Sequence, residues 1–306
     1  MSYNFIRLKV ADIIIEIKSS FPRERMNLSE ENAWFREYFS NFIYRGRILP
    51  HIRINLSVVA KLPEDKKALP MFVVVHPGDR TKNWRILKKG KDYIYRDDLK
   101  NRLKVGFVNR DFNRARLYIL PKPKKGFVWS PVDAVYDFVQ VILINYLSLR
   151  KIGFFIHGAG VRDVGGEGFM FVGKSTSGKT TLAREWNSYS KARVLNDDHI
   201  IVRRIRKKLF MYGSPWCGEY KGYKGMPQRV VINKLFFIFK NPRNAFLPIS
   251  PSAAFKLLYP NIFPNFWDKK SLFNIVALCQ DLVENTACFN LGLIKDKSVI
   301  SFVRSI

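Results

Sequence analysis

The stretch 168–181 combines residue types that can bind phosphate. Four apolar residues, 169–172, follow Gly168 and predict a short buried strand. Residues 173–180 then read Gly-Lys-Ser-Thr-Ser-Gly-Lys-Thr, a full match to the P-loop pattern. A helix is predicted to follow from Thr181. A strand, a glycine-bounded loop and a helix form the context in which this motif binds nucleotide phosphate.

The positions of the motif have separate chemical tasks. Gly173 and Gly178 let the backbone curl, so that its N–H groups point inward and form a concave anion site. Lys179 is expected to reach the β- and γ-phosphates, and the Thr180 hydroxyl to ligate Mg²⁺. We therefore predict ATP and Mg²⁺ as cofactors, with these nucleotide-binding residues: Gly173, Lys174, Ser175, Thr176, Ser177, Gly178, Lys179, Thr180 and Thr181.

Two adjacent carboxylates follow the P-loop helix. Asp197 and Asp198 come at the end of a short predicted strand, 193–195. Transfer of a γ-phosphate needs a carboxylate for the metal ion and a group that deprotonates or orients the acceptor. We predict Asp197 as the base and Asp198 as the metal ligand, and the reverse order satisfies the same chemistry. The competing interpretation is a plain Asp-Asp turn between two strands.

Two further polar residues are candidates for the same site. His157 interrupts an apolar strand, 153–161, which leads through the glycine-rich turn 165–168 into the P-loop strand. This hairpin is predicted to bring His157 back to the rim of the site as an orienting partner of the acid pair, although a lone His in such a strand is commonly a satisfied core residue. Glu219, in the irregular loop 213–219, is a further candidate ligand for Mg²⁺ or substrate.

The elements around these motifs predict an α/β (α+β) protein of two domains. Residues 1–125 contain several β patterns, such as the strict alternation over 52–58, and are predicted to form a mostly β domain that could recruit a substrate. The basic, proline-rich segment 121–126 is predicted to be a linker. Residues 126–306 are predicted to hold the P-loop in a mixed sheet with flanking helices, one of them over 131–149.

The composition limits the class of protein. With 306 residues, 47% of them hydrophobic, the chain can build a sizeable core. The net charge of +28 favours anionic partners, unless it reflects a bias of the source proteome. Three cysteines and four scattered histidines lack the spacing of a disulfide framework or a zinc site.

The start lacks a signal-peptide pattern and the longest apolar run, 139–149, is too short for a bilayer, so we expect a cytoplasmic protein without a membrane span.

The histidine strand, the P-loop and the acid pair, in this order, resemble the HPr kinase/phosphorylase family. The nucleotide-binding fold of that family is related to that of ATP-dependent phosphoenolpyruvate carboxykinase. The resemblance covers roughly residues 130–300. It implies that Lys179 and Thr180 bind phosphate and metal. It also implies that Asp197 accepts the proton of an acceptor hydroxyl, while Asp198 helps to bind Mg²⁺.

The sequence therefore predicts an ATP- and Mg²⁺-dependent kinase that transfers the γ-phosphate to a hydroxyl, most simply of serine, on a protein or peptide. Residues 213–219 replace the Ile-Arg-Gly-Leu-Gly type segment of the bacterial enzymes, so HPr is not implied as the acceptor. An acidic protein partner and a homo-oligomer stay open. The alternatives are a kinase for a small molecule such as free serine, and a regulatory module that senses ATP without transfer. Nucleic acid is not expected as a partner, because helicase and motor motifs are not found.

Overall fold

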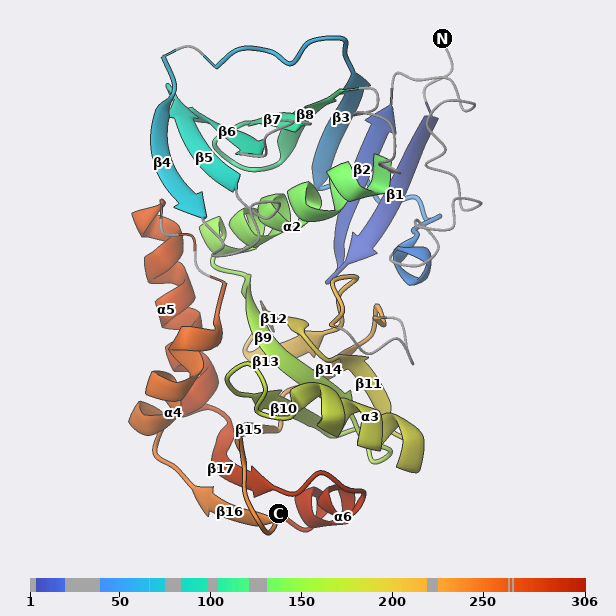
Figure 1. Cartoon of the computed structure of the whole chain (residues 1–306), viewed down its shortest axis with the longest axis vertical. Coiled ribbons are helices and arrows are strands. Elements are labelled where there is room, and N and C mark those ends of the chain that lie inside the picture. Colours follow the sequence, from blue (N-terminus) through green and yellow to red (C-terminus); the bar gives the residue numbers. More distant parts are fainter. Residues whose placement is uncertain are drawn as a thin grey trace. The chain divides into compact units, whose positions relative to one another are not determined.

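The protein is a mixed α/β structure in two compact units (Figure 1). The computed structural model describes residues 4–19, 39–65, 67–74, 84–97, 104–120, 131–218, 225–263, 265 and 267–306. These residues form 17 strands in two sheets and five α-helices, which confirms the expected fold class. The first unit takes the described residues up to Tyr146 and residues 267–269, and the second takes Leu147–Asn265 and Lys270–Ile306.

An eight-stranded sheet forms the first unit. Its strands are β1 (Asn4–Val10), β2 (Ile13–Ser19), β3 (Ile52–Val58), β4 (Leu69–Val74), β5 (Trp84–Lys89), β6 (Asp92–Asp97), β7 (Lys104–Val108) and β8 (Arg114–Ile119). They lie in the order β1-β2-β3-β8-β7-β6-β5-β4. Neighbours are antiparallel except in two places, where β3 runs parallel to β2 and to β8. The expectation that the N-terminal region is mostly β is therefore confirmed.

The helix α2 (Pro131–Leu149) covers one face of this sheet, as Figure 1 shows. Its Phe138 ring takes the space that a side chain at Gly106 would need, and it meets the Tyr95 ring edge to face with centroids 5.5 Å apart. The bounds of the helix agree with the predicted 131–149. Because most of α2 packs on the first sheet, the two compact units divide after Tyr146, later than the 125/126 division expected from the sequence. The predicted linker 121–126 lies outside the described residues.

A nine-stranded mixed sheet forms the second unit. Its strands are β9 (Gly153–Arg162), β10 (Gly168–Val172), β11 (Arg193–Asn196), β12 (His199–Ile205), β13 (Lys208–Tyr212), β14 (Arg229–Val231), β15 (Lys234–Lys240), β16 (Ala245–Pro248) and β17 (Ala287–Leu293). The order is β14-β13-β12-β9-β10-β15-β17-β16, with β11 paired to β9. The three central strands β10, β15 and β17 are parallel.

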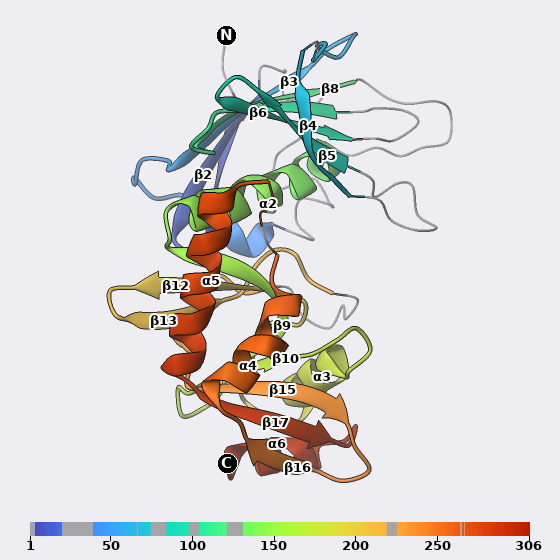
Figure 2. The same ribbon diagram turned by 90° about the vertical axis from the view of Figure 1, so that its left-hand side faces the viewer.

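Helices cover both faces of the second sheet (Figures 1 and 2). On one face, α3 (Lys179–Tyr189) and α6 (Ser298–Arg304) bury residues such as Trp186 and Val303 against Phe171 of β10. On the other, α4 (Pro251–Leu258) and α5 (Lys269–Glu284) bury residues such as Leu258 and Leu278. The unit thus has three layers. Among the described residues, every helix is too short or too polar to reach across a lipid bilayer.

The hairpin of β9 and β10 sets the position of the P-loop. The two strands are antiparallel, and Val172 at the end of β10 pairs with Gly158 of β9. This register puts His157 level with Gly173, the first residue of the loop. The hairpin predicted from the sequence is confirmed, and the residue that precedes Gly158 is brought to the rim of the loop.

Candidate active site

The backbone of the P-loop requires glycine at two positions. Gly178, the N-terminal cap of α3, has φ of 113°, and Thr176 has φ of 67°. Only glycine reaches the first of these values without strain. Gly173 is required for a different reason, because a Cβ atom there would lie 2.8 Å from the carbonyl oxygen of Ile238 on the neighbouring strand β15. The positive φ of Gly178 and the close approach of β15 at Gly173 therefore account for glycine at both positions.

Lys179 lies inside this loop. The residue is only 5% exposed, and its Nζ donates to the carbonyl oxygens of Gly173 at 2.7 Å and Lys174 at 3.0 Å. Burial lowers the pKa of its ammonium group, while the charges of Asp198 and Asp197 oppose that shift. An ammonium group enclosed by its own loop is well placed to receive a phosphate.

The other residues of the motif differ in accessibility. Lys174, Ser175, Thr176 and Thr180 are exposed, while Gly173, Ser177, Gly178 and Thr181 are half-buried. The Thr180 hydroxyl is therefore accessible to a metal ion. Glu219, the third predicted metal ligand, lies outside the described residues.

The acid pair lies in a turn against the edge of β9. Strands β11 and β12 pair with the same edge of β9, and Asp197 and Asp198 fill the turn between them. The N–H of Gly158 donates to the Asp198 carbonyl oxygen at 2.9 Å and ties the turn to β9. In this register, His157 of β9 is the direct partner of His199 of β12. Two imidazoles and two carboxylates are thereby brought together.

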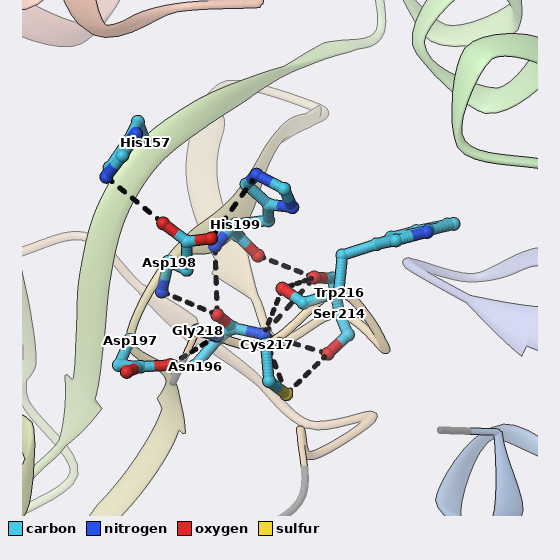
Figure 3. A network of polar contacts seen from close by, with 9 residues as sticks. All are labelled: His157, Asn196, Asp197, Asp198, His199, Ser214, Trp216, Cys217 and Gly218. Carbon is cyan, nitrogen blue, oxygen red and sulfur yellow. Dashed lines mark hydrogen bonds and ion pairs between the residues drawn. The ribbon is translucent and has the colours of Figure 1, made fainter. Parts of the chain in front are cut away.

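Two histidines flank the Asp198 carboxylate, as Figure 3 shows. The Nε2 atom of His157 lies 3.0 Å from Oδ1, and the Nε2 atom of His199 lies 3.6 Å from Oδ2. Burial lowers the pKa of both imidazoles, and the charge of Lys179 adds to the shift of His157. The two carboxylates pull in the opposite direction. A neutral His157 that donates its Nε2–H to Asp198 fits this geometry.

The Asp197 carboxylate is enclosed. The residue is 1% exposed, and its Oδ1 accepts from the N–H of Gly218 at 2.9 Å. Its Oδ2 is buried and has no hydrogen-bond partner in the part of the chain that the structure describes. A Cβ atom on Gly218 would lie 2.8 Å from this oxygen. A buried carboxylate oxygen without a partner is rare in folded proteins, and a catalytic role or a bound ion is one explanation for it.

Asn196 holds the backbone of the acid pair and was not among the residues predicted for the site. Its side chain is fully buried, and its Oδ1 accepts from the N–H groups of Asp198 at 2.7 Å and His199 at 2.9 Å. Its Nδ2 donates to the carbonyl oxygens of Ser214 at 2.9 Å and Trp216 at 3.1 Å. The one signal in the sequence is the residue type, because Asn often forms such side-chain turns with the following backbone.

The loop after β13 contacts the same group of residues through Ser214 and Cys217. The Ser214 hydroxyl donates to the His199 carbonyl oxygen at 2.6 Å. Cys217 lies nearby, and the N–H of Gly225 donates to its Sγ at 3.2 Å. Burial raises the pKa of the Cys217 thiol to about 12. A thiol that stays protonated at neutral pH is a packing group and not a nucleophile.

The predicted catalytic residues therefore meet at one end of the β9–β10 hairpin. Burial lowers the pKa of both His157 and Lys179, and the charges of Asp198 and Asp197 oppose both shifts. Among the described residues, no group of three or more His, Cys, Asp or Glu side chains forms a metal cage. Mg²⁺ commonly needs only one or two protein oxygen ligands together with phosphate oxygens and water. The oxygens of Thr180 and of the acid pair fit that requirement.

Comparison of the sequence with models of known protein families and with curated proteins gives no match. The residues of the site and their geometry are therefore the only basis for inferring a function.

Proposed function

We propose that the protein is an ATP- and Mg²⁺-dependent phosphotransferase, resembling HPr kinase, that transfers the γ-phosphate to a hydroxyl on a protein or peptide. The observation that carries this proposal is the placement of a buried P-loop lysine and a histidine-bound carboxylate at the same end of the β9–β10 hairpin. A P-loop alone supports phosphate binding, whereas a P-loop beside an oriented carboxylate supports transfer to an acceptor. We expect this activity in the cytoplasm, where ATP is present and thiols stay reduced.

The P-loop would bind and orient the phosphates. Its backbone N–H groups and the Lys179 ammonium supply the positive charge that phosphate oxygens need. Mg²⁺ would be held by the Thr180 hydroxyl and a carboxylate of the acid pair, and when bound it neutralises charge on the phosphates. The Nζ of Lys179 already faces oxygen atoms of its own loop, so phosphate oxygens would replace carbonyl oxygens around it.

Asp198 is the better candidate for the base. Its carboxylate is 27% exposed, so an acceptor hydroxyl can reach it, whereas Asp197 is 1% exposed. His157 holds Oδ1 of Asp198, so the second oxygen can take a proton while the carboxylate stays oriented. This assigns the base role in the reverse of the order that we first expected from the sequence. Asp197 would hold Gly218 through Oδ1, and its Oδ2, which has no hydrogen-bond partner among the described residues, would be the carboxylate oxygen for Mg²⁺.

Three variants test the proposal with γ-labelled ATP, Mg²⁺ and a panel of serine peptides, with free serine as a separate acceptor. Lys179→Ala should weaken nucleotide binding about tenfold or more, because it removes a charge-assisted contact to phosphate. Asp198→Asn should keep nucleotide binding and slow transfer by about 10²- to 10⁴-fold, the usual contribution of a general base. Asp281→Asn changes a carboxylate of α5 that pairs with Arg204, and it should behave like the parent.

The outcomes separate the competing functions. Label on peptide that depends on Asp198 supports the proposal. Label on free serine alone identifies a small-molecule kinase, and ATP binding without transfer to either acceptor identifies a nucleotide sensor. Equal transfer rates for Asp198→Asn and Asp281→Asn contradict the assignment of the base.

A further inference from the structure

The face of the first sheet that points away from α2 has two different halves. Over β5, β6 and β7 it is apolar and packs beneath residues of the β3–β4 connection, in a small cluster formed by Leu62, Ala68, Leu87, Ile94, Val105 and Phe107. An ion pair between Arg96 of β6 and Asp65 fastens that connection to the sheet. This half is a closed part of the core.

The other half, over β1, β2, β3 and β8, is basic. Side chains on one face alternate along a strand, and directly paired residues share a face. The registers place Arg7, Glu16, Arg53 and Arg114 in one row across the four strands. The next row holds Lys18, Asn55 and Arg116. We call the five cationic residues among these the basic face: Arg7, Lys18, Arg53, Arg114 and Arg116.

The one carboxylate among these residues, that of Glu16, forms ion pairs with two of the cations. Glu16 accepts from Nε of Arg7 at 2.9 Å and from its Nη2 at 2.8 Å, and the Lys18 ammonium lies 3.4 Å from its other oxygen. Glu16 is 3% exposed beneath these two cations. Its charge is therefore offset by Arg7 and Lys18 and does not neutralise the rest of the basic face.

Three exposed arginines of the basic face have no counter-charge among the described residues. Arg53, Arg114 and Arg116 are exposed, and none of them forms an ion pair in the part of the chain that the structure describes. Arg53 lies directly opposite Arg114 in the parallel pair of β3 and β8. Like charges in directly opposed positions destabilise a sheet, so this arrangement lowers the stability of the protein alone. An anionic partner would remove that cost.

We propose that the basic face is a docking surface for an acidic peptide segment of a partner protein. The guanidinium group presents a planar fork that pairs with a carboxylate through two hydrogen bonds. Arg114 and Arg116 are two residues apart on one strand, which corresponds to about 6.8 Å. An extended peptide with an acidic residue at every second position repeats its carboxylates at about the same distance. The spacing and the charge of the face thus match one kind of ligand.

The aromatic residues of this face favour a peptide over nucleic acid. Surfaces that bind single-stranded nucleic acid combine positive charge with rings on which bases stack. Here the half-buried rings of Phe107 and Tyr118 pack edge to face on each other, with centroids 5.9 Å apart. The ring of Phe5 lies beneath the Arg7 guanidinium at 5.3 Å. The Phe107 and Tyr118 rings are therefore engaged with each other, and Arg7 covers one face of the exposed Phe5 ring.

A binding experiment on the full chain tests this surface without nucleotide, so it is independent of the proposed phosphotransfer. The probe is a fluorescent peptide of alternating Glu and Ser, followed by anisotropy. Replacing the three arginines together, Arg53→Gln, Arg114→Gln and Arg116→Gln, should weaken binding about tenfold or more, because each lost contact is charge-assisted. The affinity of the parent should fall with added salt, since the contacts are exposed. The matching peptide of Gln and Ser should not bind.

The matched control removes the same charge from another part of the same unit. Lys88, Lys89 and Lys91 are exposed around the β5–β6 turn, and the variant Lys88→Gln, Lys89→Gln, Lys91→Gln should bind the acidic peptide within about twofold of the parent, because distant surface charges are largely screened. An equal loss in both triple variants would show an effect of net charge alone and overturn the proposal. Tighter binding of oligo(U) than of the acidic peptide, lost on changing the same arginines, would also overturn it.

Thermal unfolding at low salt gives a second readout. Without the opposed arginines, the first variant should be at least as stable as the parent, because repulsion across β3 and β8 is removed. A lower unfolding temperature than that of the lysine control would mean that the arginines support the fold itself, which would contradict the docking role.

Discussion

Asp197 and Asp198 are neighbours in the chain with different surroundings. Asp198 is half-buried between two imidazoles, whereas Asp197 is enclosed and receives a single N–H from Gly218. Lys179 acts electrostatically on the same group of residues. Two carboxylates with different access to solvent can take different tasks in one reaction. This difference is the reason that we assign the base to Asp198.

Gly218 should tolerate no side chain, because a Cβ atom there would crowd Oδ2 of Asp197. We expect Gly218→Ala to lower the free energy of unfolding by about 1–3 kcal/mol, as overpacking does, and to slow transfer as well. Gly165→Ala is the matched control, because its Cβ would meet nothing within 4 Å. The control should change stability by less than about 0.5 kcal/mol. Urea unfolding compares them, and equal effects would contradict the crowding of Asp197.

The two histidines make stability depend on pH. Burial keeps the pKa of His157 and His199 below the ordinary value in the folded chain, so the unfolded chain binds protons first as pH falls. Their contribution is therefore fully present above about pH 6.5 and is lost as pH decreases through the range below it. Urea unfolding without nucleotide or Mg²⁺ should show this decline, with a smaller decline for His157→Gln. A stability that is flat or rises on acidification would contradict the assignment.

At the scale of elements, β9 connects the two halves of the site. One edge of this strand pairs with β10, which leads into the P-loop. The other edge pairs with β12 and then with β11, and the acid pair fills the turn where one strand replaces the other. The bulge in β11 between Val194 and Asn196 accommodates that change. The strand β9 thus fixes the position of the P-loop relative to the two carboxylates.

Asn196 should be essential for this turn. Asn196→Ala removes the acceptor for two backbone N–H groups and the donor for two carbonyl oxygens, all in buried surroundings. We expect it to lower the free energy of unfolding by about 2–4 kcal/mol, because several buried polar groups lose their partners. Asn285→Ala, at an exposed position after α5, should cost less than about 0.5 kcal/mol. Chemical denaturation measures both, and a cost for Asn196→Ala as small as that of the control would contradict its role.

At the scale of the whole molecule, the candidate active site belongs to one unit. The residues described around the P-loop and the acid pair all lie within Leu147–Asn265. Core clusters on both faces of the second sheet support them. The first unit has a sheet of its own, which carries the basic face. Nucleotide binding and peptide docking are therefore separable properties.

Nucleotide should protect the second unit selectively. With Mg²⁺ and a non-hydrolysable ATP analogue at about 100 times its Kd, binding stabilises the folded site by about 2.7 kcal/mol. Hydrogen exchange followed by mass spectrometry should then slow in β10 and α3, while exchange in β3 and β8 stays unchanged. The Lys179→Ala variant, tested at the same analogue concentration, is the control, because a tenfold weaker affinity reduces the stabilisation to about 1.4 kcal/mol. Equal protection of both sheets, or protection in the variant as strong as in the parent, would contradict the site.

Much of the fold could be predicted from local patterns. The P-loop strand, the helix after it, the hairpin of β9 and β10, and the bounds of α2 depend on apolar runs, glycines and helix signals close together in the chain. Four strands were missed: β5, β7, β14 and β16. Strand β16 contains a proline and is mostly exposed, and β7 contains Gly106. Such strands form because a neighbouring strand pairs with them. Their own residues therefore give only a weak indication of β structure.

The sequence by itself determined which chemistry the chain can offer, because the residue types and conformations of a P-loop are local properties. Tertiary structure decided which groups meet. The contact of His157 with Asp198 depends on the pairing of β9 and β12, and the support from Asn196 depends on a loop that follows β13. The opposed arginines of β3 and β8 likewise follow from sheet register. Register is a relation between distant segments, set by packing the whole chain, so no short stretch of sequence contains it.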